Sequence, residues 1–196
     1  MIGVLAYGSL ITDPGEELAA VIVGEKRDVL TPFPVEFARS SQQRSGAPTL
    51  TPVASGGRAV RAIIFEVGVS EDEAIDIVYR REINAVFSGR KYVEPGPNKT
   101  NAVRLVRFAK FEGFDVVIST HMSPNIEHLS ADVLAGLAIA SAGALRDGRD
   151  GISYLLNAKA CGIETALSSA YEQEILERTG TTSLADALSV IRIGIP

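Results

Sequence analysis

The chain has 196 residues, enough for one hydrophobic core, and we expect residues 1–196 to form a single domain. Hydrophobic residues make up 46% of the chain and charged residues 22%, which is typical of a folded globular protein and excludes extensive disorder. The formal net charge of −5 argues against nucleic acid and anionic membranes as partners, and no stretch approaches the roughly 18 apolar residues of a membrane helix.

The first half of the chain is predicted to consist mainly of strands. An apolar run at residues 2–7 is typical of a strand that is buried on both faces. Gly, Pro and Ser residues separate the strand-like stretches that follow, at residues 19–24, 34–40, 49–53 and 58–67. Residues 101–111 and 114–120 flank Glu112 and Gly113, which resemble the turn of a hairpin.

Five helices are also predicted. A helix over 70–87 begins at Ser70, with Glu73 three positions later in a capping-box pattern, and a helix over 130–147 begins at Ser130. Three further helices are expected at residues 153–162, 165–180 and 183–192. Because strands come first and helices later, the pattern predicts an α+β fold. The helix over 130–147 is apolar nearly all round, which indicates either burial or a subunit contact in a homo-oligomer.

The turn directly after the first strand is a candidate ligand-binding loop. Its residues are Tyr7, Gly8, Ser9 and Leu10. Gly8 permits backbone angles that other residues resist, and successive N–H groups in such a turn can bind an anion or polarise a carbonyl group. The alternative is an ordinary turn, since Gly-Ser turns after strands are common.

Glu82 is the candidate catalytic group. A step of about 100° per residue along the predicted helix 70–87 places it in the middle of an apolar arc. That arc contains Ala74, Ile75, Val78, Tyr79, Ala85 and Val86. A carboxylate on such a face is either paired or used for acid–base chemistry in a pocket. A salt bridge to Arg80, Arg81 or a strand arginine is the structural alternative, and on the pattern alone the two interpretations weigh equally.

Other chemistry-bearing residues fit less specific roles. Arg44 either binds a substrate carboxylate or pairs with Glu36 or Glu66. The spacing of the two histidines, His121 and His128, fits no metal-binding motif, and we expect neither a metal nor another cofactor. Cys161 has no intramolecular disulfide partner and no signal peptide is visible, so the sequence predicts a cytoplasmic protein.

Three segments together resemble the γ-glutamylcyclotransferase-like superfamily, including its ChaC-type branch, which degrades glutathione. They are "YGSL" at residues 7–10, "SSQQRSGAPTLTPV" at 40–53 and "YRRE" at 79–82, and "DGISYLLNAKACGI" is similar to the helical tail of that branch. The resemblance implies a small mixed β-barrel flanked by helices. It further implies that Tyr7, Gly8, Ser9 and Leu10 form the substrate loop and that Glu82 is the acid/base, with both facing one cavity.

The activity implied by the resemblance is the release of 5-oxoproline from a γ-glutamyl amide or peptide. The α-amino group attacks its own γ-carbonyl, and Glu82 transfers the protons. The partner is then a small γ-glutamyl molecule, whose leaving group the sequence does not specify: glutathione, a γ-glutamyl amino acid, a γ-glutamyl amine and an antibiotic protecting group all stay open. The alternative is a non-catalytic ligand-binding or assembly protein with the same fold.

Overall fold

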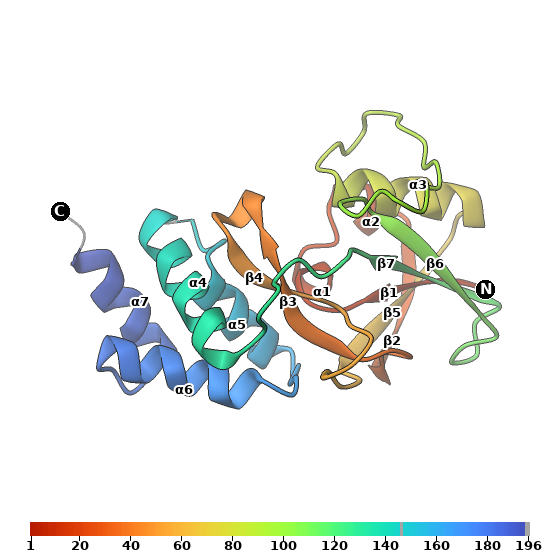
Figure 1. Cartoon of the computed structure of the whole chain (residues 1–196). Helices are drawn as coiled ribbons and strands as arrows, with labels where there is room; N and C mark the ends of the chain where they lie inside the picture. Colours follow the sequence, from red (N-terminus) through yellow and green to blue (C-terminus); the bar gives the residue numbers. More distant parts are fainter. Residues whose placement is uncertain (146, 195–196) are drawn as a thin grey trace. The chain divides into compact units, whose positions relative to one another are not determined.

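The computed structural model describes residues 1–145 and 147–194, which form two compact units. The first unit contains residues 1–31 and 61–123, and the second contains residues 32–60 and 124–196 apart from the three that are not described. Figure 1 shows the elements in chain order. The expectation that residues 1–196 make one domain stays a prediction.

A five-stranded sheet is the centre of the first unit. Its strands lie in the order β2 (Ile22–Leu30), β5 (Arg61–Val67), β1 (Ile2–Ala6), β7 (Val116–His121) and β6 (Arg104–Ala109). β1 pairs parallel to β7, and the other neighbours are antiparallel. As its apolar run predicted, β1 is a central strand, with Gly3 to Ala6 all buried.

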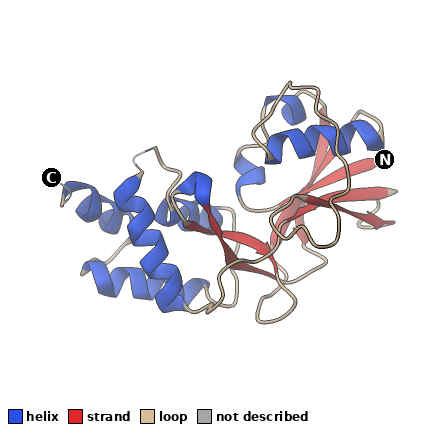
Figure 2. Ribbon diagram, turned by 45° about the horizontal axis from the view of Figure 1, so that its top comes forward, coloured by secondary structure: helices blue, strands red, loops and turns tan. Residues whose placement is uncertain are grey.

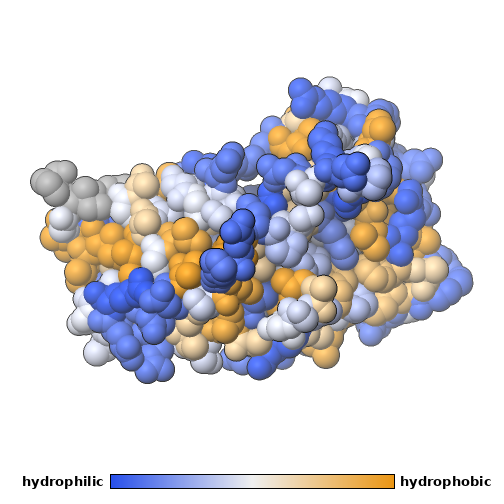
Figure 3. Space-filling view, in the orientation of Figure 1, coloured by the Kyte–Doolittle hydropathy of each residue, from blue (hydrophilic) through white to orange (hydrophobic). Residues whose placement is uncertain are grey.

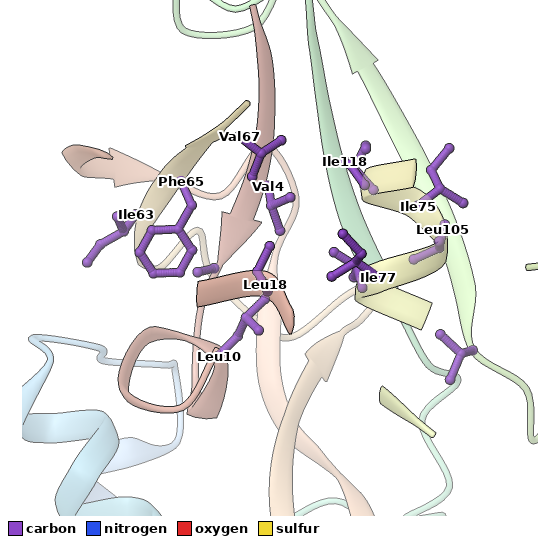
Figure 4. Close-up of a cluster of buried hydrophobic side chains, with 14 residues drawn as sticks. Val4, Leu10, Leu18, Ile63, Phe65, Val67, Ile75, Ile77, Leu105 and Ile118 are labelled. Carbon is purple, nitrogen blue, oxygen red and sulfur yellow. The ribbon is translucent and has the colours of Figure 1, made fainter. Parts of the chain in front are cut away.

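Three helices complete the first unit, and they bury one core with the sheet. They are α1 (Ser9–Thr12), α2 (Glu16–Ala19) and α3 (Glu71–Glu82), and α3 packs against α2 and β7 (Figure 2). Figure 4 shows side chains of this core from strands and helices. They include Val4, Leu10, Leu18, Phe65, Ile75, Ile77 and Ile118. Burial of such side chains is the main favourable contribution to folding.

The second unit consists of a hairpin and four helices. The hairpin joins β3 (Val35–Ser41) to β4 (Ala47–Pro52) through the short 3-10 helix η1 (Gln42–Arg44). The helices are α4 (Ala131–Ala144), α5 (Gly151–Ala160), α6 (Ser168–Thr179) and α7 (Leu184–Ile193). α4 packs against the other three helices, and Figure 3 shows hydrophobic residues in the region of α4 on the face in view. A subunit contact through α4 stays a prediction.

The α+β class is confirmed, whereas the expected barrel is wrong in its closure. Within the described residues the five-stranded sheet is open, because β2 pairs only with β5 and β6 only with β7. A barrel closes when its two edge strands pair, and here the edges carry charged residues that discourage pairing. On β2 these are Glu25, Lys26 and Arg27, and on β6 they are Arg104 and Arg107.

The predicted start of one strand is wrong, and one predicted turn is confirmed. Residues 19–24 were expected to be one strand, but α2 occupies Glu16–Ala19 and β2 begins only at Ile22. The Glu112-Gly113 turn is confirmed: both residues have positive φ angles, of 54° and 92°, as a tight hairpin turn requires. In the part of the chain that the structure describes, no helix is both long and hydrophobic enough to cross a bilayer.

Candidate functional site

The turn at residues 7–10 is held in place at both of its ends. The Tyr7 hydroxyl donates a hydrogen bond of 3.2 Å to the Thr120 carbonyl on β7. The Leu10 side chain, only 4% exposed, lies in the core of the first unit. The backbone between them is therefore fixed, although Tyr7 and Leu10 act mainly as anchors in this structure.

Gly8 makes the sharp change of direction from β1 into α1. Its φ and ψ angles are 60° and −135°, a region that residues with a Cβ atom rarely enter. Helix α1 begins at the next residue, and the first N–H groups of a helix have no partner within that helix. That the backbone donors of this turn bind a ligand stays a prediction.

Glu82 is the last residue of α3 and pairs with its neighbour Arg81. Arg81 Nη1 lies 2.8 Å from Glu82 Oε1, and the two side chains are only 15% and 16% exposed. This is one of the salt bridges that the sequence left open for Glu82. The pair satisfies the structural interpretation, and the catalytic role of Glu82 stays a prediction.

Arg81 also connects the end of α3 to the loop that follows β1. Its Nη2 atom donates to the Asp13 carbonyl at 2.7 Å and to the Ser9 hydroxyl at 3.4 Å. Glu82 and the Ser9 turn, 73 positions apart in the sequence, are therefore held by the same guanidinium group. The structure brings the acid/base candidate and the loop candidate into one hydrogen-bonded network within the first unit.

Helix α3 ends five residues earlier than the sequence predicted. Asn84 has a φ of 51°, the amide of Ala85 donates to the Arg80 carbonyl at 2.8 Å, and the amide of Asn84 donates to the Arg81 carbonyl at 3.1 Å. These bonds form a Schellman motif, which stops a helix, with Asn84 in the position that usually holds glycine. Ala85 and Val86 consequently do not belong to the arc on which Glu82 was placed.

Two charged residues of α3 are buried. Arg80 is 7% exposed and contacts Glu17 on α2, with 2.6 Å between Nη2 and Oε1. Asp76 is 8% exposed, and it accepts a bond from the Tyr92 amide and pairs with Lys91. Their partners come from distant segments, so no local sequence pattern marks these pairs.

A groove of about 560 Å³ lies beside this network in the first unit. We call it the Phe87 groove, and its lining residues are Thr12, Asp13, Pro14, Gly15, Glu16, Ala19, Val86 and Phe87. Neither Glu82 nor the turn at 7–10 is among them. The sequence did not predict this groove, because Val86 and Phe87 line it only if α3 ends before them.

Arg44 belongs to the second unit. It donates to the Arg149 carbonyl at 3.1 Å, and its guanidinium carbon lies 5.0 Å from the centre of the Tyr154 ring. Both carboxylate oxygens of Glu36 accept backbone bonds, from the amides of Phe37 and Leu167. The role of Arg44 in binding a substrate carboxylate stays a prediction.

His121 and Cys161 are each partly or largely buried. Burial lowers the pKa of His121, on β7, to about 4. Cys161 is half-buried at the end of α5, and burial raises the pKa of its thiol. Among the described residues, no group of three His, Cys, Asp or Glu side chains is arranged to bind a metal ion.

Comparisons with known proteins leave the family open. No family model matches the chain, and no curated protein matches it either.

Proposed function

We propose that the protein is a γ-glutamyl cyclotransferase with a γ-glutamylcyclotransferase-like fold. The observation that supports this most is the network in which Arg81 joins Glu82 to Ser9 and Asp13. It links the two segments that the resemblance assigns to one site. The proposal also rests on the resemblance itself, carried by residues 7–10, 40–53 and 79–82.

The reaction is an intramolecular acyl transfer. The α-amino nitrogen of the γ-glutamyl unit forms a bond to its own γ-carbonyl carbon, and the bond from that carbon to the leaving nitrogen breaks. The products are 5-oxoproline and a free amine. Because nucleophile and electrophile belong to one molecule, much of the entropic barrier of a two-molecule reaction is absent.

Glu82 carries the proton in this mechanism. As a carboxylate it takes a proton from the substrate ammonium group and returns it to the leaving nitrogen, and the second proton that the attacking nitrogen loses as the ring closes is taken up by the released amine. Arg81 orients the carboxylate through its Nη1 donor. The backbone N–H groups that follow Gly8 polarise the γ-carbonyl, where negative charge develops.

The second candidate is a non-catalytic binding or assembly protein, and the ion pair between Arg81 and Glu82 is the observation that favours it. In that case Glu82 only neutralises Arg81 and fixes the end of α3.

Release of 5-oxoproline tests the proposal directly. Glutathione, a γ-glutamyl amino acid, a γ-glutamyl amine and a γ-glutamyl-protected antibiotic precursor would each be incubated with purified protein. We expect 5-oxoproline and the matching amine in equal amounts from at least one class. Release from none of the four would favour the non-catalytic candidate.

A further inference from the structure

The Phe87 groove adjoins Arg81, the residue that pairs with Glu82. A Cβ atom added to Gly15 would lie 3.2 Å from Arg81 Cγ, so the stem of Arg81 packs closely against this part of the lining. The carbonyl of Asp13, another lining residue, accepts the 2.7 Å bond from Arg81 Nη2. A molecule in the groove would therefore lie next to Arg81, whose other nitrogen holds Glu82.

Phe87 is held in an exposed and strained position at this groove. Its side chain is 67% exposed and its φ angle is 59°, which is unfavourable for a bulky residue. It is the third residue of a turn that is closed by the bond from the Ser88 amide to the Ala85 carbonyl. The Phe87 amide also donates to Glu17 Oε2 at 3.0 Å. Strain of this kind persists only where surrounding contacts enforce it, and it is concentrated at binding sites.

The buried ion pair behind the groove enforces this conformation. Glu17 receives the Phe87 amide and pairs with Arg80, and Arg80 Nη1 donates to the Arg90 carbonyl at 3.0 Å. Both ends of the segment from Phe87 to Arg90 are thus fixed to one pair. The exposed Phe87 ring is thus carried by a segment that is hydrogen-bonded to this buried pair.

The charges of the lining favour one type of occupant. Asp13 and Glu16 contribute exposed carboxylates, and no residue of the lining, all of which the structure describes, carries a positive charge. The adjacent cation, Arg81, already donates to Glu82, Ser9 and Asp13. An occupant with its own carboxylate would meet like charges, whereas an aromatic or aliphatic group would contact Pro14, Ala19, Val86 and Phe87.

We propose that the Phe87 groove binds the leaving-group half of the substrate and selects an aromatic or apolar amine without a carboxylate. This inference rests on the proposed cyclotransferase function and names its substrate class: γ-glutamyl amines rather than glutathione or γ-glutamyl amino acids. The breaking C–N bond lies at Glu82, and the amine extends past Arg81 into the groove.

Two substrates that differ by one carboxylate test the selection. γ-Glutamylphenethylamide and γ-glutamylphenylalanine share the aromatic ring, and γ-glutamylmethylamide serves as a small reference. We expect kcat/KM to be about tenfold higher for the phenethylamide than for γ-glutamylphenylalanine at low salt, and the difference to shrink as salt screens the carboxylates. The double variant Asp13→Asn, Glu16→Gln should raise kcat/KM for γ-glutamylphenylalanine severalfold.

The ring of Phe87 is tested by Phe87→Gly, because glycine adopts the positive φ angle without strain and the variant should fold. The ratio of kcat/KM between the phenethylamide and the methylamide should fall about tenfold. Val23→Ala, at a residue that is also 67% exposed but lies on β2, should leave this ratio unchanged.

Each result is decisive. Equal or faster turnover of γ-glutamylphenylalanine, or an unchanged ratio in Phe87→Gly, would overturn the inference while 5-oxoproline release still supported the cyclotransferase. Absence of 5-oxoproline from all three substrates, together with release from glutathione, would also overturn the inference alone, whereas absence from these substrates and from all four screened classes would overturn the proposed function with it.

Discussion

Arg81 and Glu82, adjacent in the sequence, form an ion pair with 2.8 Å between Nη1 and Oε1 at the point where α3 ends. Because Arg81 also donates to the Asp13 carbonyl and the Ser9 hydroxyl, this pair joins the helix to the loop that follows β1. The same atoms support both interpretations of Glu82, as a catalytic group and as a structural one.

Arg81→Gln should destabilise the protein, because it removes charge-assisted bonds to a largely buried carboxylate and to a carbonyl group. We expect the free energy of unfolding in urea to fall by about 1–3 kcal/mol. Arg107→Gln is the matched control: Arg107 pairs with Glu71 on α3, and its side chain is 50% exposed. That change should stay within about 0.5 kcal/mol. Equal losses in the two variants would show that Arg81 does not hold the loop.

Gly8→Val should be far more damaging than Ser9→Ala. A β-branched residue at a φ of 60° and a ψ of −135° is strained, at a cost of about 1–3 kcal/mol, and the backbone donors beyond it would move. Ser9→Ala loses only one 3.4 Å bond from Arg81, worth less than about 1 kcal/mol. Urea unfolding and 5-oxoproline release would be measured for both variants. Abolished turnover in Ser9→Ala, with a covalent acyl-enzyme in the wild type, would replace our mechanism with a nucleophilic serine.

The pair between Glu17 and Arg80 should make stability depend on pH in the acid range. Hydrogen bonds from Arg80 lower the pKa of Glu17 below its ordinary value of 4.5. A lowered folded-state pKa means that this contribution is complete above pH 4.5 and disappears as the pH falls further. Glu17→Gln should flatten the loss of stability below pH 4.5. At pH 7 it should cost about 3 kcal/mol, because Arg80 is left buried without its counter-ion.

His121 should act in a different pH window. Burial lowers its pKa to about 4, whereas an unfolded chain binds a proton near 6.5. The unfolded state therefore holds more protons between these values, and stability should fall as the pH decreases from 6.5 towards 4. Urea midpoints at pH 7 and pH 5 would be compared for the wild type and His121→Phe. An identical loss in both proteins would assign the effect to other groups.

The sequence predicted most elements, because their signals are local. Ser70 and Ser130 cap their helices as expected, each accepting a bond from an amide three residues later. Alternation and turn residues likewise located the hairpin of β6 and β7. Closure of the sheet could not be predicted in this way, because it depends on contacts between distant edge strands.

Prediction of the candidate site from the sequence was limited in the same way, because its contacts join distant segments. Placing Glu82 on an apolar arc assumed a helix that continues to residue 87. Asn84, which has a positive φ angle, did not indicate an earlier helix end, because the residue in that position is usually glycine. Arg81 was one of several partners that the sequence offered for Glu82. The sequence did not predict the exposed position of Phe87, since its strained turn depends on a bond to Glu17, 70 residues away.

Glu82→Gln separates a Glu82 that transfers protons from one that only pairs with Arg81. The amide keeps the shape and still accepts a bond from Arg81, but it cannot shuttle a proton. Glu73→Gln, at an exposed position of the same helix, is the control. On the same preparations we would measure the melting temperature and 5-oxoproline release from the best substrate of the screen.

We predict that Glu82→Gln melts within about 4 °C of the wild type, equivalent to about 1 kcal/mol, while kcat falls roughly 10²–10⁴-fold. The control should match the wild type in both measurements. A Glu82→Gln protein that melts much earlier yet turns over normally once folded would contradict the account and make Glu82 a structural partner of Arg81.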